Sequence, residues 1–310
     1  MASGSVGFGV RPHRVCLSAP RRARIIGLAL AVFALVNLSD AALAATGNPK
    51  HGEYIVRLGG CHSCHTNSKK KDAPLAGGVE LKSRYGTFHV PNITPDPETG
   101  IGRWSDSDFT RAMTEGVAPD GSHYYPAFPY TSYTRMTRQD LLDLKAYLDM
   151  VKPVRNVVPP HDLRFPYNFR FALVIWKRLF FHHGEFKPDL KQSASWNRGA
   201  YLVTGPSHCG ECHTARNFFG ATIQDQTLAG TKNGPDGKSV PNITPRPKEG
   251  IGLWSAKDVV NFLKTGTPPF GEEVGYPMDE VIANSTSHWT DDDLKATTTY
   301  LMSLPQRLTP

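Results

Sequence analysis

Two stretches with one pattern, CHSCH at residues 61–65 and CGECH at residues 209–213, decide which fold this chain adopts. Each has a cysteine, a second cysteine three positions later, and a histidine directly after it. On a helix these three side chains lie on one face. A c-type haem needs this set, because two thiols form thioethers to it and the imidazole binds its iron. The pattern predicts two covalently bound haem c groups, held by Cys61, Cys64, Cys209 and Cys212, with His65 and His213 as proximal iron ligands.

Two other chemistries use a C-x-x-C pair, and both fit this chain less well. A zinc site needs a second pair of ligands at short range, and neither half of the chain has another cysteine outside its motif. A thioredoxin-type redox pair follows a strand in a βαβ context, which the sequence pattern does not indicate. Because the motifs use all four cysteines after residue 44, no thiol is left for a disulfide, a nucleophile or a cysteine axial ligand.

The first 44 residues have the pattern of a secretory signal peptide. Three arginines, at positions 21, 22 and 24, precede an apolar run over residues 25–38, and Ala42-Leu43-Ala44 follows. An uncleaved membrane anchor is the alternative interpretation, but the apolar run is short for crossing a bilayer. We therefore expect cleavage near Ala44 and a periplasmic protein, either free or peripheral to the inner membrane.

The positive charge of the whole chain does not indicate a nucleic-acid partner. The full sequence has 35 basic and 28 acidic side chains, and residues 1–44 contain five arginines and one aspartate. The remaining chain therefore has 30 basic and 27 acidic side chains, a net charge of +3. Four haem propionates would bring this close to zero. The basic pI is therefore no argument for a nucleic-acid partner, and we expect none.

The chain repeats itself at a spacing of about 150 residues. VPNITPDPETGIGRWS at 90–105 matches VPNITPRPKEGIGLWS at 240–255 almost residue for residue. TRQDLLDLKAYL at 137–148 and TDDDLKATTTYL at 290–301 each start with Thr and continue with apolar residues at helical spacing, as a capped helix does. We also expect a short helix after Trp104 and after Trp254, long loops and few strands. The repeat predicts domains at 45–151 and 196–310, joined by a linker at 152–195.

These motifs, together with YPAFPY at residues 125–130 and WNRGAYLV at 196–203, resemble those of a known family. It comprises the di-haem and tri-haem cytochromes c that accept electrons as subunits of bacterial periplasmic dehydrogenases, which oxidise alcohols, sugar acids such as gluconate, or aldehydes. The resemblance implies an all-α fold of two tandem class-I-like cytochrome c domains, rich in loops, with one covalent haem each. It also implies an electron-transfer protein or subunit, a dehydrogenase as donor, and an oxidase or another cytochrome as acceptor.

The linker contains the apolar run FRFALVIWKRLFF at residues 169–181. Arg170, Lys177 and Arg178 interrupt it, and it is too short to span a membrane. One interpretation is a helix packed between the two domains. The other is an amphipathic surface helix that gives a peripheral contact with a membrane or a partner protein.

The sixth iron ligands are predicted less directly, because the two halves differ there. In the second half Met278 follows Tyr276-Pro277 in a loop, and we expect it to bind the second iron. Alignment of the Tyr-Pro pairs places Ala127 or Phe128 at the equivalent position of the first half, and phenylalanine cannot bind iron.

Met136, just before the closing helix, is therefore our predicted ligand of the first iron. Met113 is opposite Leu263 in the repeat and is expected to be a core residue. A bis-histidine iron, with His123 or His89, and an open five-coordinate iron are the alternatives. An open iron would permit a peroxidase-like di-haem enzyme, which is the competing function.

Four residues of the repeated loop are candidates for the haem edge. Buried propionates need hydrogen-bond donors, and the loops contain amides and indoles. We expect propionate contacts from Asn92, Trp104, Asn242 and Trp254. The alternative is that these residues only shape a rigid turn.

Overall fold

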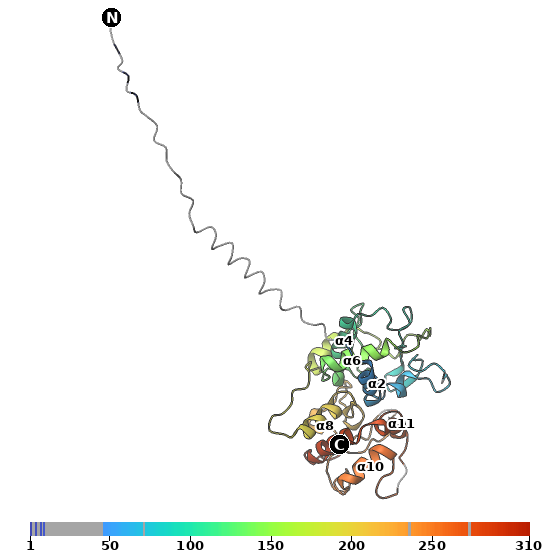
Figure 1. Ribbon diagram of the computed structural model, residues 1–310. Coiled ribbons are helices and arrows are strands. Elements are labelled where there is room, and N and C mark those ends of the chain that lie inside the picture. Colours follow the sequence, from blue (N-terminus) through green and yellow to red (C-terminus); the bar gives the residue numbers. More distant parts are fainter. Residues whose placement is uncertain are drawn as a thin grey trace. The chain divides into compact units, whose positions relative to one another are not determined.

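The computed structural model describes residues 46–310 except Lys71, Pro235, Asp236, Glu272 and Glu273, together with Met1, Gly4, Gly7 and Gly9. The predicted signal peptide at 1–44 lies, apart from those four residues, outside the described part of the chain. The chain divides into two units, Met1–Ala45 and Thr46–Pro310. All that follows concerns the second unit, which Figure 1 shows in colours from blue to red.

The first half is built on two crossing helices. Helix α2 (Pro49–Leu58) packs on α6 (Arg138–Leu148), and its buried face includes Ile55 and Leu58. The helices meet at Gly52, where an added Cβ atom would lie 1.9 Å from the carbonyl oxygen of Asp143. Only a residue without a side chain fits this crossing. The short helix α3 (Cys61–His65) follows α2 directly and carries the first C-x-x-C-H motif.

The same arrangement recurs in the second half. Helix α8 (Ala194–Thr204) packs on α12 (Asp291–Ser303). Gly199 lies at their crossing, where a Cβ atom would lie 2.0 Å from the carbonyl oxygen of Ala296. Helix α9 (Gly210–His213) follows α8 and carries the second motif. Each motif is therefore attached to the crossing helix pair of its own half.

The predicted helix starts are confirmed. Thr137 and Thr290 cap α6 and α12, and each hydroxyl accepts a hydrogen bond from the backbone N–H three residues on. Ser105 and Ser255 form capping boxes at the starts of α4 (Asp106–Glu115) and α10 (Ala256–Thr265). These two helices are the ones expected after Trp104 and Trp254.

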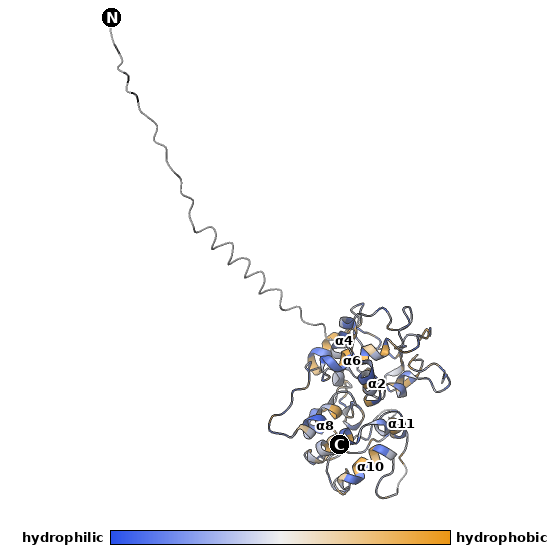
Figure 2. Cartoon of the chain, viewed as in Figure 1, coloured by the Kyte–Doolittle hydropathy of each residue, from blue (hydrophilic) through white to orange (hydrophobic). Residues whose placement is uncertain are grey.

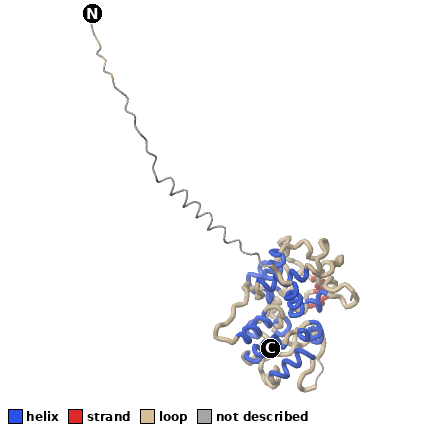
Figure 3. The backbone as a smooth tube through the Cα atoms, viewed as in Figure 1, coloured by secondary structure: helices blue, strands red, loops and turns tan. Residues whose placement is uncertain are grey.

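The all-α expectation holds only in part, because the described chain also contains a small antiparallel sheet. Strands β1 (Glu80–Ser83), β2 (Gly86–His89) and β3 (Asp162–Leu163) pair in that order. Gly86, at a φ of +124°, lets β3 approach, because a Cβ there would lie 2.3 Å from the carbonyl oxygen of Asp162. The fold is mostly helix and loop (Figure 3), and the strands are too short to give a clear alternating pattern.

The remaining elements are short and lie in the long loops. They are α5 (Tyr130–Tyr133), α7 (Ala172–Phe180), η1 (Gln224–Gln226), α11 (Met278–Asn284) and η3 (Thr286–His288). Figure 2 shows hydrophobic and hydrophilic residues interspersed along the labelled helices, as expected where one face is buried. Within the described ranges, no helix is long and apolar enough to cross a membrane.

The linker lies against the first half rather than apart from it. Besides strand β3, the N–H of Val154 donates to the Thr94 hydroxyl, and the Asn156 side-chain amide donates to the Ala76 carbonyl. Helix α7 buries Leu173 and Lys177, while the Trp176 indole donates at 2.9 Å to the carbonyl oxygen of Phe219 in the second half. Helix α7 therefore contacts both halves, while its Val174, Ile175 and Leu179 are exposed.

Candidate functional site

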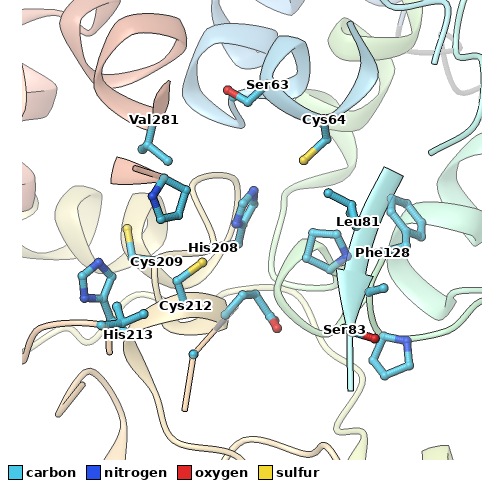
Figure 4. A pocket seen from close by; sticks show the side chains of 18 of the residues that line it. Ser63, Cys64, Leu81, Ser83, Phe128, His208, Cys209, Cys212, His213 and Val281 are labelled. Carbon is cyan, nitrogen blue, oxygen red and sulfur yellow. The ribbon is translucent and has the colours of Figure 1, made fainter. Parts of the chain in front are cut away.

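The two C-x-x-C-H helices line one cavity. Its volume is about 3230 Å³, and its lining includes both cysteines and the histidine of each motif. This is about three times the upper end of the usual range for a small-molecule site, roughly 1,000 Å³. Figure 4 shows Cys64, Cys209, Cys212 and His213 in this pocket. The space suits ligands much larger than one drug-sized molecule.

The four cysteines of this cavity are free thiols. Burial, together with the thiol of Cys64, raises the pKa of Cys61 to about 12. Burial also raises the pKa of Cys212 to about 11, with smaller contributions from Glu211 and from Cys64 of the other motif. Figure 4 shows Cys64 and Cys212 in the same pocket, so residues of both motifs lie in one cavity.

Both motif histidines are held as neutral imidazoles in one orientation. The Nδ1–H of His65 donates to the carbonyl oxygen of Pro91 at 2.8 Å, and that of His213 donates to Pro241 at 2.7 Å. Burial lowers the pKa of His65 to about 4 and lowers that of His213 as well. With the proton on Nδ1, the lone pair of Nε2 is available to a metal. The site therefore fits a histidine-ligated haem in each half.

The cavity walls also correspond between the halves. Phe109, Ala112 and Met113 lie on one face of α4 and line the cavity. Their counterparts on α10, 150 residues later, are Val259, Phe262 and Leu263, which line it too. Such apolar walls exclude water and lower the local dielectric, as a buried haem requires.

The structure brings one of the two predicted methionine ligands into the cavity. Met278 begins α11 and lines the cavity. Met136 is 2% exposed and belongs to the core of the first half, against Ile55 and Leu144. It is not among the residues that line the cavity. Met113, expected to be only a core residue, belongs to that core and also lines the cavity.

The two candidate histidines of the first half lie differently. His123 does not line the cavity, and its Nδ1 lies 2.9 Å from the Nζ of Lys177. His89 lines the cavity from strand β2, and its backbone N–H donates to Nδ1 of His161. Of these two candidates for a bis-histidine iron, His89 is the one that lines the cavity.

The loop asparagines are engaged within the protein. The Asn92 amide donates to the Thr99 hydroxyl and the Val154 carbonyl, and its oxygen accepts from Thr94. Asn242 has the same role, with the Arg307 carbonyl as acceptor and Thr244 as donor. Both N–H groups of Asn92 are used, which leaves none for a propionate. The asparagines therefore brace the loop.

The indoles are placed differently from the asparagines. Trp104 and Trp254 both line the cavity, and among the described residues neither indole N–H has an acceptor. An indole N–H can only donate a hydrogen bond. Both are therefore available to an anionic group of a bound ligand.

Sequence reasoning missed a buried carboxylate inside the second motif. Glu211 accepts hydrogen bonds from Thr131 and Ser132 of α5 and forms an ion pair with Arg216. Burial raises the pKa of Glu211, but Arg216 and the two hydroxyls more than offset this, so its pKa lies below the usual value. A charged residue within a haem-binding motif was the available signal. The two hydroxyl groups that donate to it belong to the other half, and no sequence pattern indicates them.

Further contacts join the halves around the motifs. The rings of Tyr133 and His208 meet edge to face with centroids 5.5 Å apart, and Nε2 of His208 lies 3.2 Å from the carbonyl oxygen of Gly59. The Asn284 amide of α11 donates to the Ser63 hydroxyl inside the first motif. Both motifs are thus fixed by residues of the opposite half.

Comparison with known proteins agrees with this geometry. The family model described as Cytochrome c matches residues 50–152. A "Diheme cytochrome c-type" protein of Cereibacter sphaeroides is 42% identical over 269 residues, which are 84% of this chain and 87% of that protein.

Two longer relatives are subunits of dehydrogenases. The alcohol dehydrogenase (quinone) cytochrome c subunit of Gluconobacter oxydans is 40% identical over 91% of this chain and 59% of its own length. The fructose dehydrogenase cytochrome subunit of Gluconobacter japonicus is 40% identical over 83% of this chain and 52% of its own length. The chain thus spans little more than half of these two relatives. None of the three is named a peroxidase, so the alternative of an open-iron enzyme gains no support. The chain belongs to the cytochrome c family that includes di-haem cytochromes c and the cytochrome c subunits of bacterial dehydrogenases.

Proposed function

We propose that this chain is an exported di-haem cytochrome c that carries electrons from a dehydrogenase towards a respiratory chain. The observation that carries the proposal is the pair of C-x-x-C-H helices on one apolar cavity, each with a neutral histidine oriented by a carbonyl group. A bound haem supplies a one-electron Fe(III)/Fe(II) couple, which requires no acid or base from the protein.

In this proposal each motif forms two thioether bonds to its haem. The orientation of each motif histidine makes it the proximal ligand of the iron. Cys61, Cys64, Cys209 and Cys212 hold the two haems covalently. His65 and His213 bind the irons through Nε2, and Met278 binds the second iron from the start of α11. The carbonyl groups of Pro91 and Pro241 keep both imidazoles in the ligating tautomer.

The domain boundaries are proposed at 45–151 and 196–310, with 152–195 as the linker. The recurrence of the helix crossing, of the histidine-to-carbonyl bond and of the capping boxes supports one haem per half. We assign Trp104 and Trp254 to the propionates, because both indoles line the cavity and Asn92 is engaged elsewhere.

The dehydrogenase partner is inferred from the relatives, several of which are named as subunits of such enzymes. Residues 165–181 are the proposed contact region, since Phe171, Ile175 and Leu179 are exposed and also border the cavity. A redox partner must approach the haem edge closely, and apolar residues at that edge suit a protein interface. A peripheral contact of residues 169–181 with the inner membrane is the secondary assignment.

A periplasmic location, after removal of residues 1–44, completes the proposal. The test is expression of the full chain in a bacterium that matures c-type cytochromes. A haem-stained band of the shortened chain in the periplasmic fraction is expected. The purified ferric protein should then be reduced by the dehydrogenase encoded nearest to it, given that enzyme's substrate. Rapid turnover of peroxide, with no reduction by any dehydrogenase, would overturn the electron-carrier assignment.

A further inference from the structure

The methionines that face the cavity differ between the halves by a reciprocal exchange. Two wall positions are compared between the halves: 113 with 263, and 128 with 278, where Phe128 is one of the two residues that the Tyr-Pro alignment places opposite Met278. In the second half they are Leu263 on α10 and Met278 at the start of α11. In the first half they are Met113 on α4 and Phe128 in a loop. Each pair contains one methionine, but on different elements.

All four of these residues line the cavity that contains the motif histidines. In the second half, the sulfur at the cavity wall comes from Met278 at the start of α11, and the wall position on α10 is the aliphatic Leu263. The first half has the same two wall positions with the apolar group and the sulfur exchanged. Packing does not require this exchange, because leucine and methionine have similar volumes and either would fill the wall position on the helix.

Phe128 occupies the loop position and belongs to an aromatic cluster. Its ring meets Tyr124 edge to face at 5.4 Å and Tyr133 at 5.7 Å, measured between centroids. Tyr133 is also in the core cluster that contains Met113. The cluster closes this side of the pocket without offering a ligand atom, so any sulfur ligand must come from another element.

The methionines of the first half then separate by position. Met150 is 72% exposed and lies past the end of α6. Met136 is 2% exposed, and the void it borders has a volume of only about 10 Å³. Met113 borders that void too, but it also lines the large cavity together with His65. Among the described residues, Met113 is the methionine of the first half that faces the proposed haem.

We propose that Met113 Sγ is the sixth ligand of the first haem iron, in place of Met136. The inference rests on the proposed function, since it requires a haem on the first motif. An unbranched thioether side chain is flexible enough to reach a ligand position from a helix. The C-terminal end of α4 is held in place, because Nζ of Lys177 donates at 2.7 Å to the carbonyl oxygens of both Glu115 and Gly116. The first iron is thus ligated from a helix and the second from the start of α11.

The experiment compares three variants of the matured protein, Met113→Leu, Met136→Leu and Met278→Leu. Three properties are measured: haem content, the long-wavelength charge-transfer band of the methionine–ferric iron bond, and the two reduction potentials. Met113→Leu is expected to keep two haems, to lose half of the band, and to lower one potential. Met278→Leu should lose the other half of the band and lower the other potential. Met136→Leu is the matched control and should leave the band and both potentials unchanged.

The outcomes separate this inference from the proposed function. Loss of half the band in Met136→Leu, or an unchanged band in Met113→Leu, would overturn the Met113 assignment. If the same proteins still contain two haems per chain, the proposed electron-carrier function stands. A chain without haem would overturn both.

If Met113→Leu fails to fold, the wild-type protein gives the answer. Methionine labelled with ¹³C in its methyl group should show two strongly shifted methyl signals in the ferrous state. Both should persist in Met136→Leu and Met150→Leu. Disappearance of a shifted signal in either variant would contradict the assignment.

Discussion

The Thr131 hydroxyl donates a hydrogen bond of 2.7 Å to the carboxylate of Glu211, so the second motif is attached to a helix of the first half. The same carboxylate accepts from Ser132 and pairs with Arg216. This largely buried group lines the cavity that contains both motifs. We therefore expect its charge to affect both the cohesion of the halves and the potentials of the proposed haem irons.

We predict that Glu211→Gln lowers the free energy of unfolding of the holoprotein by about 1.5–3 kcal/mol, the usual contribution of hydrogen bonds to a charged group. The amide loses the charge that balances Arg216. The midpoint of urea unfolding measures the change. Glu98→Gln is the control, since its ion pair with Arg155 is much more exposed and should matter little. Equal midpoints for wild type and Glu211→Gln would contradict this role.

The reduction potentials should respond to the same variant. A buried negative charge favours the ferric state, so Glu211→Gln is expected to raise the potential of at least one haem. A spectroscopic redox titration measures it, with Glu98→Gln, at a residue that does not line the cavity, as the unshifted reference. A fall in potential would show that the negative charge of Glu211 does not stabilise the ferric state.

Lys177 gives a prediction for pH dependence. Burial lowers the pKa of its ammonium group to about 8, against about 10.4 in an unfolded chain. Between these values the unfolded chain binds more protons, so this group makes the protein more stable as pH rises from about 8 to about 10.4. Lys177→Met should remove that rise, and urea midpoints across this range measure it. Lys187→Met, at an exposed position, should keep the rise. An identical pH dependence in Lys177→Met and wild type would contradict the account.

The helix crossings should not tolerate a methyl group. Gly199→Ala would bring Cβ to about 2.0 Å from the Ala296 carbonyl oxygen, so α8 and α12 must separate. We expect a loss of about 1–3 kcal/mol, as for other overpacked cores. Thermal unfolding measures it, with Lys295→Ala on the exposed side of α12 as the control. No change in Gly199→Ala would mean that the crossing can relax freely.

The regular elements were largely predictable from local sequence. The cap residues Thr137, Thr290, Ser105 and Ser255 begin the helices that were expected, because capping depends on atoms within three residues. The β1–β2 hairpin was not expected, since four-residue strands show too little alternation. Its third strand comes from the linker, and pairing at that separation has no local signal.

The site residues of the motifs were predictable. The residues whose role depends on the direction of their side chains were not. Cys and His positions follow from the C-x-x-C-H spacing. The choice between Met113 and Met136 depends on which way each side chain points, and that depends on packing between α4 and α6. Asn92 looked like a ligand contact, but its acceptors include Val154, which is 62 residues away. Glu211 and Thr131 are 80 residues apart.

The indoles provide a test of the propionate assignment. Trp104→Phe keeps an aromatic side chain in the wall but removes the N–H donor, so the propionate charge is less compensated. The potential of the first haem is therefore expected to fall. Trp196→Phe is the control, because that indole already donates at 2.6 Å to the Ser303 hydroxyl. A potential that does not move in Trp104→Phe would assign the indole to shaping the loop.

The central claim is that each motif binds one haem, and the haem content of the matured chain tests it most directly. Intact-mass measurement and the alkaline pyridine spectrum should give two covalent haems per polypeptide. Cys61→Ser with Cys64→Ser should leave one haem, and so should Cys209→Ser with Cys212→Ser. A wild-type chain that carries one haem or none after maturation would contradict the account.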